Sequence, residues 1–172
     1  GLNSAVALTW SPDGKAIAVA GSDVEGAAAG NQAWLFILER GRKPRKLTED
    51  SISLAGGYAP LVPAPEMRWT SDGRILFLAG HQGQMSLFAL SVEGDEPRQI
   101  TTGGAGIGQV TFSAGAARAV IQNLPTDSAG DLILIEVESG AATQLTDYNR
   151  DFFQENPAAR VEKSSIHRAG YE

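Results

Sequence analysis

The strongest constraint in this sequence is a pattern that occurs three times in the same order. Each copy opens on an aromatic residue and a turn, at Trp10–Gly14, at Trp69–Gly73 and, in a more divergent form, at Phe112–Ala116. Two short apolar runs follow each opening. They lie at 16–20 and 33–38, at 75–79 and 85–90, and at 117–121 and 132–137.

Each copy ends on a Leu-Thr or Ile-Thr pair, and the closing threonines Thr48, Thr101 and Thr146 are 53 and 45 residues apart. Repeats of about 40 to 50 residues, with four short strands each, are typical of β-propeller blades. The turn Ser11–Gly14 suits a hairpin, because Pro presets the backbone, Asp bonds its own backbone and Gly takes the left-handed conformation. The repeat therefore predicts blades built from hairpins.

We expect an all-β fold of about three four-stranded antiparallel blades. First strands are expected at 4–10, 66–70 and 108–113, with second and third strands at the apolar runs and fourth strands at the closing pairs. The segment Ala5–Trp10 does not alternate cleanly between apolar and polar residues, which predicts a strand buried on both faces. No segment has sustained helical spacing, so almost no helix is expected.

The composition excludes several kinds of site and partner. The 172 residues include no cysteine, which excludes disulfides, a thiol nucleophile and a zinc ribbon. No metal or other cofactor is expected, because His81 and His167 have no carboxylates at convincing zinc-site spacing. The net charge of −6 argues against nucleic acid and anionic membranes as partners. Apolar runs of about six residues fall far short of the roughly 20 in a membrane span, and the opening at Gly1 shows no signal peptide.

Blades that open with an aromatic residue, Ser, Pro, Asp and Gly and close with Leu-Thr resemble the PD40, or TolB-like, repeats. The resemblance covers residues 4–146. It is shared by TolB-type periplasmic propellers and by the propeller domains of the prolyl oligopeptidase family. Residues Leu145–Asn149 and Val161–Glu172 resemble the exit from a last blade into the first strand of an α/β-hydrolase domain. The acylaminoacyl-peptidase branch is the most similar, although Arg168–Gly170 lacks the Asp usual in that turn.

This resemblance implies the C-terminal part of a seven-bladed propeller, because three blades cannot close a ring and propellers have about four to eight. Residues 1–146 would be blades, and residues 147–172 a linker and the start of the first hydrolase-domain strand. The implied partners are the remaining blades and the hydrolase domain, in the same polypeptide or a second chain, and short peptide substrates. A homo-oligomer also stays open.

The implied function is an accessory, substrate-gating part of a cytoplasmic serine peptidase of the prolyl oligopeptidase family that hydrolyses short peptides. The alternative is a TolB-like propeller that binds proteins and catalyses nothing. The next stretch of sequence would discriminate them, since a nucleophile motif would indicate the peptidase.

No catalytic residue is expected within this chain. A hydrolase nucleophile needs Gly-x-Ser-x-Gly between a strand and a helix, and in Gly83–Leu87 the serine stands one position late. A triad needs a histidine held by an acid, whereas His81 falls in a predicted turn and His167 in the linker. Both histidines are therefore expected at the surface.

Other candidate sites favour structural roles. The run Gly103–Gly108 lacks the helix that must follow a phosphate-binding loop, so a linker between blades is expected. Five basic residues in Arg40–Lys46 predict a solvated turn rather than a site for an acidic partner. Two further sets are assigned surface and packing roles: the carboxylates Asp23, Glu25, Asp127 and Asp131, which lack the EF-hand pattern, and the tryptophans Trp10, Trp34 and Trp69, expected in the core or between blades.

Loops are distributed unequally between the two ends of the predicted blades. One end has short turns, whereas the other carries the segments 22–32, 50–65, 102–107 and 124–130. Function usually resides in longer loops. We therefore expect the end that carries Asp50–Pro65 to face the hydrolase domain or the substrate entrance.

Overall fold

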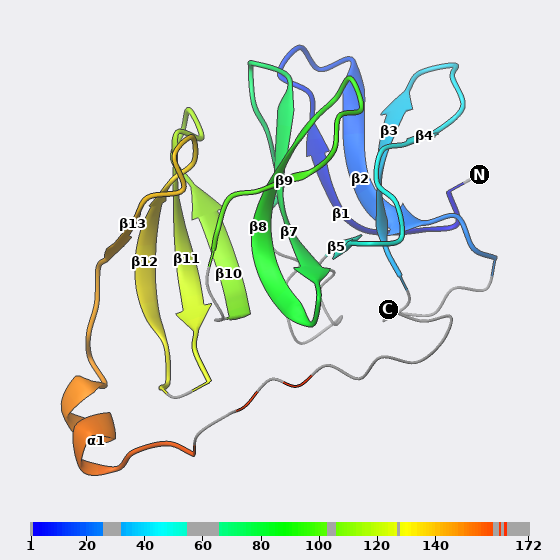
Figure 1. Ribbon diagram of the computed structural model, residues 1–172. Coiled ribbons are helices and arrows are strands. Elements are labelled where there is room, and N and C mark those ends of the chain that lie inside the picture. Colours follow the sequence, from blue (N-terminus) through cyan, green and yellow to red (C-terminus); the bar gives the residue numbers. More distant parts are fainter. Residues whose placement is uncertain are drawn as a thin grey trace.

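Three antiparallel sheets follow one another along the chain and stand side by side in the computed structural model (Figure 1). The structure describes residues 2–25, 32–54, 66–102, 106–126, 128–159, 162 and 164. The first sheet contains β1 (Ser4–Trp10), β2 (Ala16–Ser22), β3 (Trp34–Glu39) and β4 (Arg45–Lys46) in that order. The third contains β10 (Gly106–Phe112), β11 (Arg118–Leu124), β12 (Asp131–Glu136) and β13 (Ala142–Gln144). These sheets confirm the expected fold class.

The second sheet has five strands rather than four. It contains β5 (Ser53–Leu54), β6 (Arg68–Trp69), β7 (Arg74–His81), β8 (Gln84–Ser91) and β9 (Arg98–Gln99). Two segments share the edge of β7: Leu54 pairs with Ala79, and Trp69 pairs with Ile75. The expectation of a loop throughout 50–65 is therefore wrong at β5, and residues 55–65 lie outside the described residues.

A short helix, α1 (Arg150–Glu155), follows the third sheet where a polar linker was expected. It buries none of its residues, and an ion pair joins Arg150 to Asp147. Six residues are too few for a helical repeat to show in the sequence. No helix among the described residues has the length and apolar character to cross a membrane.

The turns between first and second strands have the predicted chemistry. The amide of Gly14 donates to the Ser11 carbonyl at 3.0 Å, and Gly14 has φ +69°. Gly73 repeats this with φ +80° and a bond to the Thr70 carbonyl. In the third turn Ala116 takes the left-handed conformation, with φ +54°. The motif thus keeps its geometry where its sequence has diverged.

Apolar side chains pack in two layers between neighbouring sheets. Ile75 and Phe77 of β7 face Leu35 and its neighbours in the first sheet. The alternate residues of β7, such as Leu76 and Leu78, belong to the layer shared with the third sheet. Because successive side chains of a strand point to opposite faces, the middle sheet contributes to both layers.

Each closing threonine bonds a leucine in the third strand of its repeat. The hydroxyl oxygen of Thr48 accepts from the Leu35 amide at 2.9 Å, and Thr101 and Thr146 make the same contact with the amides of Leu87 and Leu132. The backbone of the residue before each threonine bonds the same strand residue. In each Leu-Thr or Ile-Thr pair, the first residue therefore bonds the neighbouring strand through its backbone amide, and the threonine bonds it through its side chain.

Candidate functional site

The outer face of the first sheet, turned away from the second, exposes apolar side chains. Leu8 is 62% exposed, Trp10 is 59% exposed and Val6 is 37% exposed. Beside them lies a hollow of about 520 Å³ lined by residues that include Trp10, Ile17 and Leu38. The expectation that β1 is buried on both faces is wrong, and Trp10 is exposed rather than packed in the core or between described sheets. Large apolar patches on a surface mark interaction sites.

The opposite end of the stack also exposes leucines. Leu124, Leu132 and Leu145 are 39%, 42% and 51% exposed. Leu132 pairs across the strands with Gln122 and so faces away from the layer that contains Ile121. The outer faces of the first and third sheets therefore carry apolar side chains, as do the sheet faces packed in the interior of the stack.

The other two tryptophans are packed, as expected. Trp34 is 7% exposed, its indole nitrogen donates to Asp50 at 2.9 Å, and the Lys46 ammonium lies 3.6 Å from its ring centroid. Trp69 packs against the layer between the first two sheets. Arg40–Lys46 forms the exposed hairpin expected of it, although Lys46 has this cation–π contact.

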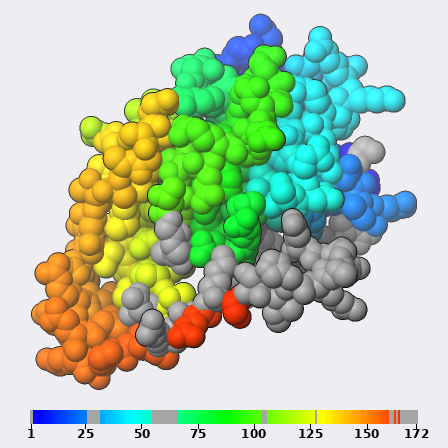
Figure 2. All heavy atoms as spheres, in the orientation of Figure 1, coloured from blue at the N-terminus to red at the C-terminus, as the bar shows by residue number. Residues whose placement is uncertain are grey.

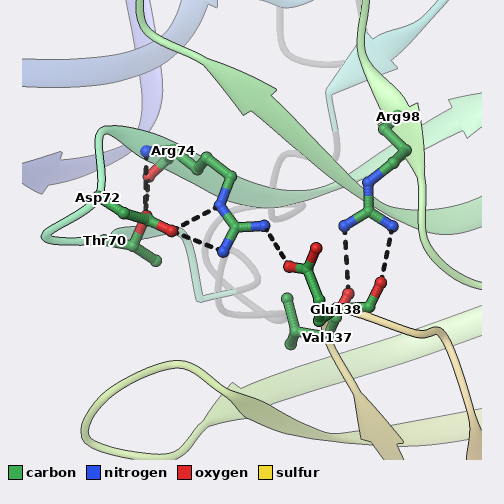
Figure 3. Close-up of polar contacts among 6 residues, drawn as sticks. All are labelled: Thr70, Asp72, Arg74, Arg98, Val137 and Glu138. Atoms are coloured by element: carbon green, nitrogen blue, oxygen red, sulfur yellow. Dashed lines mark hydrogen bonds and ion pairs between the residues drawn. The ribbon is translucent and has the colours of Figure 1, made fainter.

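Arginines connect each sheet to the next at the end that carries the short turns. Arg45, the first residue of β4, donates to the carbonyl of Val92 at 2.9 Å. Arg98, the first residue of β9, repeats this contact on the third sheet, where it donates to the carbonyls of Val137 and Glu138 at 3.3 Å (Figure 3). The sequence contained a signal for this inter-sheet contact, since both arginines open the closing tetrad of their repeat.

Arg74 adds a charged contact at the second junction. Its guanidinium bonds Asp72 in its own turn and Glu138 of the third sheet, the latter at 2.8 Å (Figure 3). The hydrogen bond from Arg74, together with one from Thr70, lowers the pKa of Asp72 below its ordinary value. The same contacts with Asp72 and Glu138 raise the pKa of Arg74.

Asp13 occupies the position of Asp72 in the first turn. It accepts a hydrogen bond from the Ser11 hydroxyl at 2.7 Å and one from the Lys15 amide at 3.1 Å. The Ser11 bond is the main cause that lowers the pKa of Asp13, and the Lys15 amide is the second. Both aspartates therefore stabilise turns, and neither is poised to transfer protons.

The described histidine has a structural contact. His81 is the last residue of β7, so the expectation that it falls in the turn is wrong by one residue, and its Nδ1 lies 3.0 Å from the Ser51 carbonyl. Its ring contacts Phe88 edge to face. His81 is therefore held by a backbone carbonyl and an aromatic ring, and not by the acid of a catalytic triad. His167, Asp127 and residues 103–105 lie outside the described residues, and β10 begins at Gly106 as a strand.

The carboxylates do not form a metal site in the described part of the chain, where no group of three His, Asp or Glu side chains is arranged to hold an ion. Asp131 instead accepts from the Thr146 hydroxyl at 2.7 Å. The backbone carbonyl of Asp23 accepts from Asn3. The described surface therefore offers packing faces and inter-sheet contacts rather than a catalytic constellation.

No family model and no curated protein sequence matches this chain. Solved structures do. TolB from Acinetobacter baumannii superposes with a TM-score of 0.60 and 20% identity over 85% of this chain and 33% of its own. A puromycin-hydrolyzing peptidase of Mycobacterium tuberculosis gives 0.65 and 17% over 83% and 21%. Dipeptidyl peptidase 4 of Porphyromonas gingivalis gives 0.59 and 14% over 84% and 26%.

These similarities establish the fold of the chain, which is a set of β-propeller blades of the kind found in TolB and in peptidases. The chain spans about a fifth to a third of the length of these structures. Fold alone does not determine function, since both a TolB protein and peptidases share it.

Proposed function

We propose that this chain is the propeller part of a serine peptidase and controls the access of short peptides to a hydrolase domain. The observation that carries the proposal is the segment after the third blade. Residues 145–149 and 161–172 resemble the exit into a hydrolase strand. In support, the chain leaves the third sheet after β13 and continues through α1 (Figure 1).

In this proposal the chemistry belongs to residues outside the chain. A serine of the hydrolase domain attacks the peptide carbonyl, a histidine takes the hydroxyl proton and returns it to the leaving amine, and water releases the acyl-enzyme. The propeller excludes large folded substrates and supplies contacts that orient short ones. Residues 1–146 provide the blades, and residues 147–172 lead into the hydrolase domain of a cytoplasmic enzyme.

The exposed faces at both ends of the stack support the proposed partners. Three sheets leave two apolar outer faces, around Trp10 and around Leu132. Further blades would cover these faces as the middle sheet is covered here. Isolated residues 1–172 should therefore aggregate or form a swapped oligomer, and a stable cooperative monomer would contradict this proposal.

A fluorophosphonate probe tests the peptidase assignment on the complete polypeptide in which these residues occur. We expect one labelled serine within a Gly-x-Ser-x-Gly motif and hydrolysis of short aminoacyl substrates. Intact mass spectrometry of the same sample shows whether a hydrolase-sized segment or second chain is present. An unlabelled protein whose polypeptide ends near residue 172 would refute the proposal.

A TolB-like binding propeller is the second candidate. The similarity to TolB from Acinetobacter baumannii covers 85% of this chain, which is as extensive as the similarity to the peptidases. Under this function the complete polypeptide would bind a protein partner and show no serine reactivity. The fluorophosphonate experiment therefore separates the two candidates.

The proposed orientation has its own test. In the complete enzyme, residues 55–63 are replaced by a short Gly-Ser segment, which leaves β5 and its pairing with β7 intact. If this end faces the hydrolase domain or the entrance, kcat/KM should change with peptide length while the thermal midpoint is retained. Unchanged rates across several peptide lengths would place the entrance elsewhere.

A further inference from the structure

A groove lies where the outer strands of the first and second sheets meet. It has a volume of about 420 Å³ and is lined by residues from the chain after β4, from β7 and β8, and from the turn between β8 and β9. Figure 2 shows the cyan atoms of residues 32–54 beside the green atoms of the second sheet. The volume falls within the usual range of ligand sites, about 300 to 1,000 Å³.

The floor of this inter-blade groove includes apolar side chains. Phe88 and Ile52 are 3% and 4% exposed, and Leu47 lies beside them. The Phe88 ring also contacts His81 edge to face, which fixes the position of both rings. An apolar side-chain stem that entered the groove would therefore be buried against rings that are already held in place.

One wall is held firmly in place by side chains of both sheets. The Trp34 indole donates to Asp50 at 2.9 Å, and the Gln32 amide donates to the Ile52 carbonyl at 2.8 Å. From the second sheet, His81 Nδ1 donates to the Ser51 carbonyl at 3.0 Å. A wall fixed from two sides needs little ordering when a ligand binds, which favours affinity.

The charged groups along the groove all have one sign. Glu49 lies on the first wall, and Asp95 and Glu96 lie on the opposite wall. No lysine or arginine lines the groove, and none of the three carboxylates belongs to an ion pair within the described residues. These carboxylates can only accept hydrogen bonds.

His81 holds the backbone of the first wall. A carbonyl oxygen can only accept, so the contact with Ser51 places a proton on Nδ1 of His81. The groove thus combines an apolar floor with acceptors and negative charge at its rim.

We propose that this inter-blade groove binds a lysine or arginine side chain of a peptide, with the apolar stem on Phe88 and the cationic head among Glu49, Asp95 and Glu96. A neutral side chain of equal length would leave the carboxylates without a partner, and an anionic one would be repelled. The inference concerns binding alone, so it holds or fails independently of the peptidase assignment.

A pair of capped tripeptides tests the inference on the complete polypeptide. Acetyl-Ala-Lys-Ala-amide carries the cation, whereas the norleucine analogue keeps a similar stem without charge. We expect the lysine peptide to bind at least about tenfold more tightly by calorimetry, and added salt to weaken it selectively. Equal affinities, or no heat with either peptide, would overturn the proposal.

Variants locate the binding to this groove. Glu96→Gln should weaken the lysine peptide about threefold, and Glu49→Gln combined with Glu96→Gln about tenfold, with norleucine binding unchanged. Glu155→Gln, in the exposed helix α1, removes the same charge elsewhere and should have no effect. Retained affinity in the double variant, or an equal loss in Glu155→Gln, would show that the groove is not the site.

Discussion

Replacing the closing threonines with valine should destabilise the three blades unequally. Each threonine hydroxyl accepts a hydrogen bond from the amide of the first leucine in the paired strand, at 2.9 to 3.0 Å. The contact is buried at Thr48, partly buried at Thr101 and exposed at Thr146. Valine keeps nearly the same shape and removes the hydroxyl, which at Thr146 also donates to Asp131 at 2.7 Å.

The magnitude follows from what replaces the lost acceptor. Leu35 is 0% exposed and Thr48 is 1% exposed, so the Leu35 amide would stay buried without a partner. Such a group costs about 1 to 3 kcal/mol, and we expect Thr48→Val to lower the free energy of unfolding by about 2 kcal/mol. Water can replace both the acceptor near Leu132 and the donor to Asp131, so Thr146→Val should cost less than about 1 kcal/mol. Thr101→Val should lie between them.

Urea denaturation of the complete polypeptide, followed by tryptophan fluorescence, measures these differences. Thr48→Ser is the control, because it keeps the hydroxyl and loses only a methyl group, at about 0.8 kcal/mol. Equal losses for Thr48→Val and Thr146→Val, or a larger loss for Thr48→Ser than for Thr48→Val, would refute the reasoning from burial.

Three further predictions concern turns, pH and the outer face. Gly14→Ala should cost about 1 kcal/mol in urea denaturation, because φ is +69° with no atom within 4 Å of the new methyl, whereas Gly115→Ala, equally uncrowded and not left-handed, should be neutral. The pKa of Asp72 is lowered in the fold, so its stabilisation is present above the ordinary value of 3.8 and lost as the pH falls through the folded value. Asp72→Asn should therefore reduce the acid-induced loss of thermal stability, by at most about 1 kcal/mol at this exposed site, and an unchanged acid limb would contradict this. Trp10→Ser should lower the thermal midpoint of the complete polypeptide, because a covered apolar contact is lost. The same variant should reduce aggregation of isolated residues 1–172 in size-exclusion chromatography. A variant that destabilises the complete polypeptide and also increases aggregation of the isolated residues, or that improves both, would argue against a covered outer face.

The sequence alone determined the order and chemistry of the blades. The turn Ser11–Gly14 and its later copies specify hairpins through the conformations that Pro, Asp and Gly adopt locally. The Leu-Thr pairs and apolar runs recur at blade spacing, so the strands could be placed within a few residues. These features act over short distances along the chain, so their pattern can be recognised from the sequence without a structure.

The tertiary structure decided what lies between blades. The split edge formed by β5 and β6 depends on two segments, 13 residues apart in the sequence, that both pair with one strand, β7. The exposure of Trp10 depends on whether another sheet stands beside β1, since the same apolar strand can be core or surface. The groove at Phe88 exists because residues 46 positions apart in the sequence, Glu49 and Asp95, lie on its two walls. Burial and proximity arise from packing among distant segments, and a local pattern does not contain that information.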